Sequence, residues 1–199
     1  ADFIPDLGSQ PDKLLEIIGD YDALIVRSQT KPNAEVIARA SRLRAIGRAG
    51  VGVDNIDREA ASAHGVIVMN TPTGNTVSTA EHAFALMLAT ARNIAPAHAG
   101  VLAGDFKNSR KAFSGIEMNG KRLAVIGMGR IGSEFVKRAQ GFNMKVVAFD
   151  PFLTQARADE LKIELADSPD AVLDGADVVT LHVPLTDDTR HIINAERLA

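Results

Sequence analysis

The chain has 199 residues, and its 22 lysines and arginines against 25 aspartates and glutamates give a formal net charge of −3. This near balance argues against a nucleic acid or an anionic membrane as partner. With 46% hydrophobic and 24% charged residues, the composition is that of a globular protein and excludes a disordered chain. The absence of cysteine excludes a disulfide framework, a thiolate nucleophile and a cysteine-ligated metal, and it fits a cytoplasmic location. No apolar window reaches the ~18 residues of a membrane span, and the first residues lack the layout of a signal peptide.

Short apolar runs alternate with helical segments in the first part of the chain. We expect helices at residues 14–19, 33–40 and 57–64 and strands at residues 23–26, 43–46 and 65–69, the first of these strands being buried. Such alternation predicts a parallel sheet with helices on its faces.

The same alternation returns after a long interdomain helix that we expect at residues 76–93. A polar stretch at 104–119 predicts a loop. Beyond it we expect strands at 122–126, 145–149, 162–165 and 177–181 and helices at 131–141 and 154–161. The sequence therefore predicts two α/β domains, residues 1–73 and residues 74–199.

Residues 127–132, Gly-Met-Gly-Arg-Ile-Gly, match the dinucleotide-binding pattern of three spaced glycines. The pattern gains weight here because a predicted strand precedes it and a predicted helix and strand follow it. Gly127 permits a tight turn, Gly129 lets a pyrophosphate approach the backbone, and Gly132 lets helix and strand pack closely. The N-terminus of the following helix offers unpaired N–H groups to the phosphates.

Asp150 ends the second strand of this unit, eighteen residues after Gly132. Its carboxylate can accept hydrogen bonds from both hydroxyls of the adenosine ribose and would repel a 2′-phosphate, which favours NAD over NADP. The structural alternative is that Asp150 only opens a turn before Pro151 and that the glycines serve tight packing.

Four segments together resemble the D-isomer-specific 2-hydroxyacid dehydrogenases, and within them the branch that oxidises 3-phosphoglycerate to 3-phosphohydroxypyruvate in serine biosynthesis. These segments are residues 25–30, 47–57, 70–75 and 125–132. The resemblance implies a Rossmann-type doubly wound nucleotide domain that binds NAD, a flavodoxin-like α/β substrate domain, an anionic 2-hydroxy acid as substrate, and a homodimer or higher homo-oligomer. It also implies that both domains are incomplete in this chain.

The resemblance further assigns roles to individual positions. The residues matched to substrate binding are Arg27, Ser28, Gly50, Val51, Gly52, Asn75 and, more loosely, Arg110 or Lys111. Beyond the three glycines and Asp150, the residues matched to cofactor binding are Arg130, Ile131, Pro184 and Thr189. Independently of the resemblance, Arg27 follows a predicted strand, where parallel sheets bind ligands, and its planar guanidinium suits a carboxylate or phosphate. The alternatives are a surface salt bridge for Arg27, a plain turn at residues 50–52, and a solvated charge pair at Arg110 and Lys111.

The catalytic groups of the family are an arginine, a glutamate and a histidine, which the resemblance places beyond Ala199. We expect a structural role for the chain's own histidines, which are His64, His82, His98, His182 and His191. Two other functions stay open: a dehydrogenase for another 2-hydroxy acid, and a non-catalytic NAD-sensing protein of the corepressor type with the same architecture.

Overall fold

The computed structural model describes residues 1–198, and the chain divides into two compact units, Ala1–Asn75 and Thr76–Ala199. Each unit is built around its own parallel sheet.

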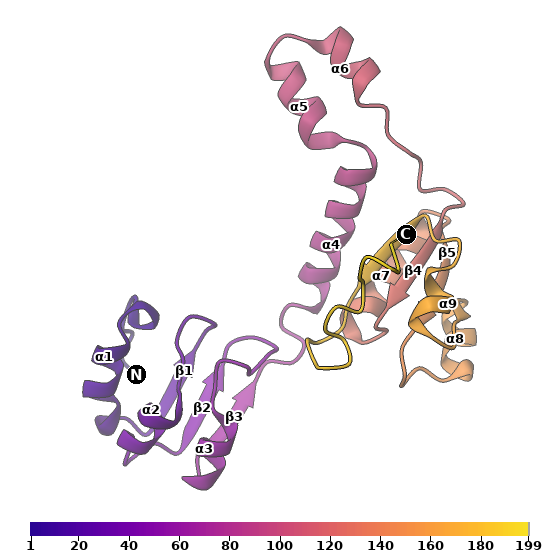
Figure 1. Ribbon diagram of the computed structural model, residues 1–199. Coiled ribbons are helices and arrows are strands. Elements are labelled where there is room, and N and C mark those ends of the chain that lie inside the picture. Colours follow the sequence, from indigo (N-terminus) through magenta and orange to yellow (C-terminus); the bar gives the residue numbers. More distant parts are fainter. Residues whose placement is uncertain (199) are drawn as a thin grey trace. The chain divides into compact units, whose positions relative to one another are not determined.

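The first unit contains three parallel strands in the order β1-β2-β3 (Figure 1). The strands are β1 (Ala23–Val26), β2 (Ala45–Arg48) and β3 (Ile67–Asn70). The helices are the short 3-10 helices η1 (Leu7–Ser9) and η2 (Ile18–Asp20) and the α-helices α1 (Pro11–Ile17), α2 (Ala34–Arg39) and α3 (Arg58–Ala63). Asn33 and Asp57 cap α2 and α3, each accepting a hydrogen bond from the backbone three residues ahead. These caps confirm the predicted helix starts, whereas β2 begins two residues later than predicted.

The helices of this unit pack on one face of its sheet. Val26 and Ile46 point into a core shared with Leu14, Ile18 and Ile37 of the helical layer. On the opposite face, strand residues are open to solvent, as shown by Ile25, which is 82% exposed. The prediction that the strand at 23–26 is buried is therefore wrong: alternate side chains of a strand point to opposite faces, and only one face is covered here.

The second unit has a four-stranded parallel sheet in the order β6-β5-β4-β7. Its strands are β4 (Arg122–Ile126), β5 (Lys145–Phe149), β6 (Glu164–Leu165) and β7 (Val178–Leu181). Its helices are α4 (Thr76–Ala91), α5 (Ile94–Leu102), α6 (Phe106–Ala112), α7 (Arg130–Gly141), α8 (Gln155–Leu161) and α9 (Pro169–Leu173). Strands β4 and β5 have the predicted bounds.

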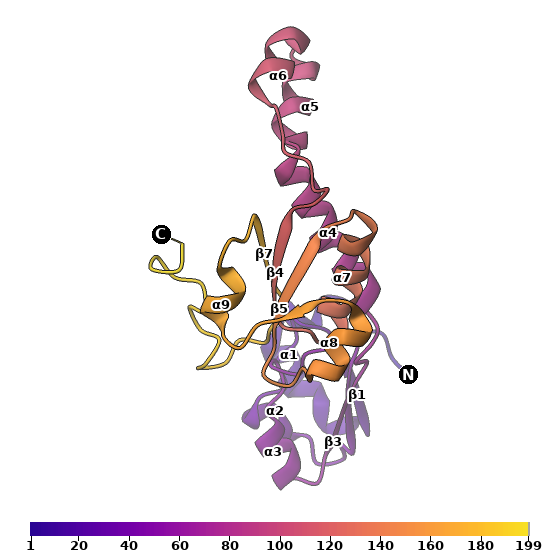
Figure 2. The same ribbon diagram turned by 90° about the vertical axis from the view of Figure 1, so that its right-hand side faces the viewer.

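Helices cover both faces of the second sheet (Figure 2). Leu123 and Val125 of β4 face a core that includes Phe135 of α7 and Phe84 of α4. The alternate residues of β4, together with Val172 of α9, form a smaller core on the other face. This is the doubly wound arrangement predicted for the nucleotide domain.

The stretch predicted as a loop at 104–119 contains a helix, α6, which pairs with α5 at the end of α4 away from the sheet (Figure 1). The two helices approach closely because Gly100 has no side chain: a Cβ added there would collide with the Oγ of Ser109. Ser109 is accordingly buried although its neighbours are polar and exposed. The polar composition suggested a loop because this helix is solvated on most of its surface. Within the described residues, no helix has the length and apolar character needed to cross a membrane.

Candidate functional site

The three glycines of the turn between β4 and α7 differ in how much space surrounds them. Gly127 has a φ of 96°, and a Cβ added there would lie 2.5 Å from the carbonyl oxygen of His182. A Cβ on Gly132 would collide with the carbonyl oxygen of Gly127. Gly129 differs, because no atom lies within 4 Å of an added Cβ. Two of the glycines therefore allow the turn to form, and the space beside the third is available for a ligand.

Helix α7 begins directly after Gly129, which occupies its N-cap position. The carbonyl of Gly129 accepts the Ser133 N–H at 3.0 Å, the first turn of the helix. No hydrogen bond within the described residues engages the N–H groups of Gly129 and Ile131. Donors at the positive end of a twelve-residue helix favour an anion such as a phosphate.

Asp150 lies at the end of β5 beside the glycine turn, and both of its carboxylate oxygens already accept backbone hydrogen bonds. Oδ2 accepts the Met128 N–H at 2.7 Å and Oδ1 accepts the Phe152 N–H at 2.8 Å. The sequence also allowed that Asp150 only opens a turn before Pro151. The hydrogen bond from the Phe152 N–H is a turn contact of this kind, whereas the bond from the Met128 N–H is not. A carboxylate oxygen can accept more than one hydrogen bond, so the ribose contact stays a prediction.

The segment after β7 brings Pro184 and Thr189 together. The Oγ1 of Thr189 donates to the carbonyl of Pro184 at 2.5 Å and accepts the Thr186 N–H at 2.8 Å. Val183, which precedes this segment, lies 2.8 Å from an added Cβ on Gly127. The segment therefore begins beside the glycine turn, and the roles of Pro184 and Thr189 in cofactor binding stay predictions.

In the first unit, the carboxyl end of β1 carries Arg27 and Ser28. Asn55 holds this segment, because its Nδ2 donates to the carbonyl oxygens of Arg27 and Thr30 at 3.1 and 2.7 Å. The Arg27 guanidinium is exposed and forms no hydrogen bond or ion pair with any residue that the structure describes. The surface salt bridge considered from the sequence is thus not present in this part of the chain, and the charge is available to an anion.

The predicted loop at residues 50–52 adjoins the same end of the sheet. The carbonyl of Gly50 accepts the Thr71 N–H at 3.0 Å, and the carbonyl of Val51 accepts from Asn70 Nδ2 at 2.6 Å. The N–H of Gly50 donates to the Arg48 carbonyl at 2.9 Å, and the role of residues 50–52 in substrate binding stays a prediction. The tight turn after β2 thus uses the Gly50 amide, whereas no described residue accepts a hydrogen bond from the N–H groups of Val51 and Gly52.

Arg48 is a candidate anion-binding residue that sequence reasoning missed. It ends β2 in register with Val26, so it lies next to the β1 end that carries Arg27. Its guanidinium donates to Ser28 Oγ at 3.0 Å and stacks so closely on Gly50 that a Cβ there would collide with it. Its Nε is buried without a hydrogen-bond partner among the described residues. The signal that could have found it is an arginine at the carboxyl end of the strand that neighbours Arg27.

The remaining substrate candidates are Arg110, Lys111 and Asn75. Arg110 and Lys111 lie in the last turn of α6, on the helix pair at the end of α4. Asn75 is the last residue of the first unit and is exposed. The two-unit division assigns Arg110 and Arg27 to different bodies, and the role of Arg110 stays a prediction.

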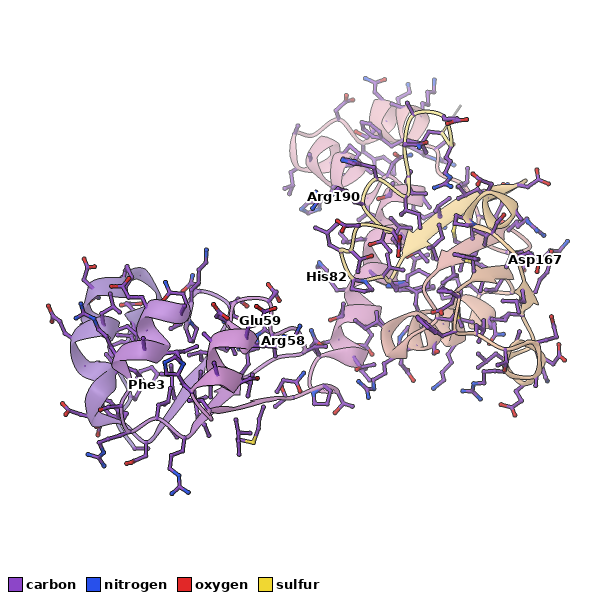
Figure 3. All side chains as sticks on the ribbon, turned by 60° about the horizontal axis from the view of Figure 1, so that its bottom comes forward. Phe3, Arg58, Glu59, His82, Asp167 and Arg190 are labelled. Atoms are coloured by element: carbon purple, nitrogen blue, oxygen red, sulfur yellow. The ribbon has the colours of Figure 1, made fainter. Side chains whose placement is uncertain are left out.

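The histidines do not form a catalytic group within the described residues. His64, His82, His98 and His191 are exposed, as Figure 3 shows for His82 on α4. His64 bonds through Nδ1 to the Ala60 carbonyl at 2.9 Å. None of the five histidines forms an ion pair with a carboxylate in the part of the chain that is described, and no cluster there has the residues to hold a metal ion.

The features of the second unit fit a bound dinucleotide. The open space at Gly129 and the donors of the first turn of α7 suit a pyrophosphate, and Asp150 lies at the adjoining strand end, where a ribose would lie. Gly127, Gly129, Gly132, Ile131 and Asp150 would hold the group, with Arg130 at the same helix start.

Comparison with known proteins agrees with this geometry. Residues 84–199 match the family model for the D-isomer specific 2-hydroxyacid dehydrogenase, NAD binding domain. The chain is 50% identical over 192 residues to the D-3-phosphoglycerate dehydrogenase of Methanocaldococcus jannaschii, covering 96% of this chain and 36% of that protein. It is 43% identical over 199 residues to the D-3-phosphoglycerate dehydrogenase of Bacillus subtilis, covering 100% of this chain and 37% of that protein.

Solved structures show the same relationship. The TT0316 protein from Thermus thermophilus superposes with a TM-score of 0.87 at 35% identity, covering 100% of this chain and 60% of that one. The D-lactate dehydrogenase from Escherichia coli superposes with a TM-score of 0.79 at 28% identity, covering 94% of this chain and 58% of that one. The chain thus spans a little over a third of the length of the two curated relatives. Fold, glycine turn and family match together establish that the chain belongs to the D-isomer specific 2-hydroxyacid dehydrogenases and carries their NAD-binding domain.

Proposed function

We propose that the protein is an NAD-dependent dehydrogenase that oxidises 3-phosphoglycerate to 3-phosphohydroxypyruvate. Residues 1–73 are its substrate-binding domain and residues 74–199 its nucleotide-binding domain. The names of the relatives from Methanocaldococcus jannaschii and Bacillus subtilis support this substrate. The observation that carries the proposal is the pair of arginines, Arg27 and Arg48, at the carboxyl ends of adjacent parallel strands.

Two arginines suit a substrate with two anionic groups. The Arg27 guanidinium has no partner among the described residues, and Arg48 donates from Nη2 to Ser28 Oγ while no described residue accepts a hydrogen bond from its Nη1. Guanidinium groups bind carboxylates and phosphates through two parallel hydrogen bonds. A phosphorylated hydroxy acid would satisfy both, whereas an unphosphorylated one has a single anionic group to offer.

The residues of the chain have distinct tasks in this reaction. Bound NAD supplies the acceptor for the hydride that leaves C2 of the substrate. The turn at Gly127 to Gly132 positions the pyrophosphate, Asp150 holds the ribose, and Pro184 and Thr189 flank the adenosine half. Arg27, Ser28 and Arg48, with the amides of Val51 and Gly52, hold the anionic groups of the substrate and fix its orientation. The proton of the C2 hydroxyl must pass to a general base, and no histidine among the described residues is paired with a carboxylate for this role.

An assembly of two or more copies is part of the proposal, with helices α4, α5 and α6 as the contact surface. Large apolar side chains on these helices are exposed: Leu86 by 55%, Ile94 by 52%, Leu102 by 75% and Phe106 by 63%. Apolar side chains that gather on neighbouring helices favour a protein partner over water. We place the enzyme in the cytoplasm, in keeping with a cysteine-free chain.

The experiment is an assay of NADH formation by the full-length enzyme that contains this chain. D-3-phosphoglycerate is compared with D-lactate, which lacks the phosphate. We expect kcat/KM to be at least a hundredfold higher for the phosphorylated acid, because about 3 kcal/mol of charge-assisted bonding is lost without it. Equal values would favour a different 2-hydroxy acid, and NADH binding without any turnover would favour the NAD-sensing alternative.

A further inference from the structure

Among the described residues, His182 is the one histidine that is partly buried, and it contacts the glycine turn. Its N–H donates to the carbonyl of Ile126 at 2.8 Å, so it continues the pairing of β7 with β4 up to the residue before Gly127. Its own carbonyl oxygen then lies 2.5 Å from where a Cβ of Gly127 would be. The backbone of His182 is thus in direct contact with the first residue of the turn.

The side chain of His182 contacts the other end of the same turn. Its Cβ lies 3.6 Å from an added Cβ on Gly132, and its ring packs on Phe135 of α7 with the ring centres 5.2 Å apart. The Nε2 atom shares a hydrogen bond of 3.1 Å with Thr180 Oγ1, which fixes the rotation of the ring. Burial lowers the pKa of the imidazole below its ordinary value. The residue therefore joins β7, the glycine turn and α7.

We propose that His182 is a positioning residue for the dinucleotide: through its carbonyl and its ring it sets the distance between Gly127 and the first turn of α7. The N–H groups that face a pyrophosphate lie on the segment between these two contacts, at Gly129 and Ile131. A phosphate cradle of backbone donors depends on their relative placement, and a shift of a fraction of an ångström weakens several hydrogen bonds together. This inference rests on the dinucleotide role of the turn.

The test measures binding and folding separately on the full-length enzyme. Affinities for ADP-ribose, which contains the pyrophosphate, and for adenosine, which does not, are measured for the wild type and for His182→Ala, His182→Phe and Thr180→Val. Thermal unfolding is followed for each variant. His64→Ala serves as the matched control, because His64 is an exposed histidine at the end of α3 in the first unit.

We expect His182→Ala to weaken ADP-ribose binding about tenfold and adenosine binding less than twofold, a difference of about 1.4 kcal/mol. His182→Phe keeps a ring against Phe135 and should recover most of the lost affinity. Thr180→Val removes only the hydrogen bond to Nε2 and should give an intermediate loss. This variant is nearly isosteric, so it provides the answer if His182→Ala does not fold.

Three results would overturn the proposal. Unchanged ADP-ribose affinity in folded His182→Ala and Thr180→Val would show that the ring does not position the turn. Equal losses for ADP-ribose and adenosine, or a lower melting temperature with unchanged affinities, would show a purely structural role. A wild-type enzyme that fails to bind ADP-ribose would instead contradict the dinucleotide role itself, and with it the proposed function.

Discussion

Asp150 and Met128 are joined by a hydrogen bond of 2.7 Å from the Met128 N–H to the Asp150 carboxylate, which links the end of β5 to the centre of the glycine turn. The second carboxylate oxygen holds the Phe152 N–H at 2.8 Å. Asp150 is therefore a support of the turn as well as the proposed acceptor for the ribose hydroxyls. Removing its charge should affect both the choice of cofactor and the stability of the turn.

We expect the enzyme to bind NAD at least tenfold more tightly than NADP. A 2′-phosphate would lie against the Asp150 carboxylate, and one such unfavourable contact costs about 1–3 kcal/mol. Asp150→Ala should abolish the preference and also weaken NAD, because Met128 loses its acceptor. Calorimetric titration with both cofactors measures the two effects. Asp167→Ala is the control, since Asp167 is exposed in the loop before α9 (Figure 3). A preference that survives in Asp150→Ala would end its assignment to the ribose.

Alanine substitutions at two glycines of the turn should have different effects, one on NAD binding and the other on folding stability. Gly129→Ala places a methyl group in open space at a φ of −67°, which alanine adopts readily, so the protein should fold with its melting temperature nearly unchanged. The methyl group occupies the space assigned to the pyrophosphate, and NAD affinity should fall at least tenfold. Gly132→Ala should instead lower the melting temperature, because its Cβ collides with the Gly127 carbonyl. If Gly129→Ala binds NAD normally, the pyrophosphate does not lie there.

Arg27 and Arg48 should both matter for the substrate and neither for the cofactor. We expect Arg27→Ala and Arg48→Ala in the full-length enzyme to lower kcat/KM for D-3-phosphoglycerate by the equivalent of about 1.5–3 kcal/mol each, the value of a charge-assisted hydrogen bond. NAD affinity should stay within twofold of the wild type. Arg42→Ala is the matched control, because Arg42 is exposed and pairs with Asp22 at 2.9 Å. Unaltered kinetics in Arg27→Ala would show that Arg27 is an ordinary surface residue and does not bind the substrate.

The sequence predicted the nucleotide unit better than the substrate unit for a physical reason. Strands β4 and β5 are buried on both faces, so each carries a continuous apolar run after its first residue. Strand β1 is covered on one face only, and Ile25 gives no sign in the sequence that it faces solvent. Helix α6 was missed because Asn108, Ser109 and Arg110 form no apolar stripe, and its contact with α5 depends on one glycine.

The residues of the candidate site likewise divide into those that the sequence predicts and those that it does not. The glycine turn was predictable because its three glycines meet local requirements within a few residues of chain, namely close contacts at Gly127 and Gly132 and open space at Gly129. The Asp150–Met128 bond joins residues 22 apart, and the contact of Arg48 with Ser28 joins residues 20 apart on neighbouring strands. Contacts of this kind depend on strand register, which a single sequence does not specify.

Stability should depend on pH through Asp177, at the start of β7. The hydrogen bond from Lys121 Nζ at 2.8 Å, followed by that from the Arg122 N–H at 2.9 Å, lowers the pKa of the Asp177 carboxyl. A carboxyl whose pKa is lower in the folded state stabilises it above the unfolded pKa of about 3.9, and this contribution is lost as the pH falls through the folded value. Asp177→Asn should therefore lower the melting temperature at pH 7 and differ less from the wild type near pH 3. A difference that grows on acidification would contradict this sign.

The 199-residue chain by itself should bind NADH without oxidising D-3-phosphoglycerate. The donors of the glycine turn and the Asp150 carboxylate are all present, so the anchors for the pyrophosphate and the adenosine ribose exist within it. Hydride transfer also needs a general base and a cation that polarises the developing carbonyl. Among the described residues no histidine is paired with a carboxylate, and the partly buried one, His182, packs on Phe135. A missing base costs about 10²- to 10⁴-fold in rate, and a missing electrostatic group about 10²- to 10³-fold more.

The measurement compares NADH binding and NADH formation for this chain and for the full-length enzyme. Turnover by the short chain at a comparable rate would show that one of its five histidines is the base, and single histidine-to-glutamine variants would then identify it.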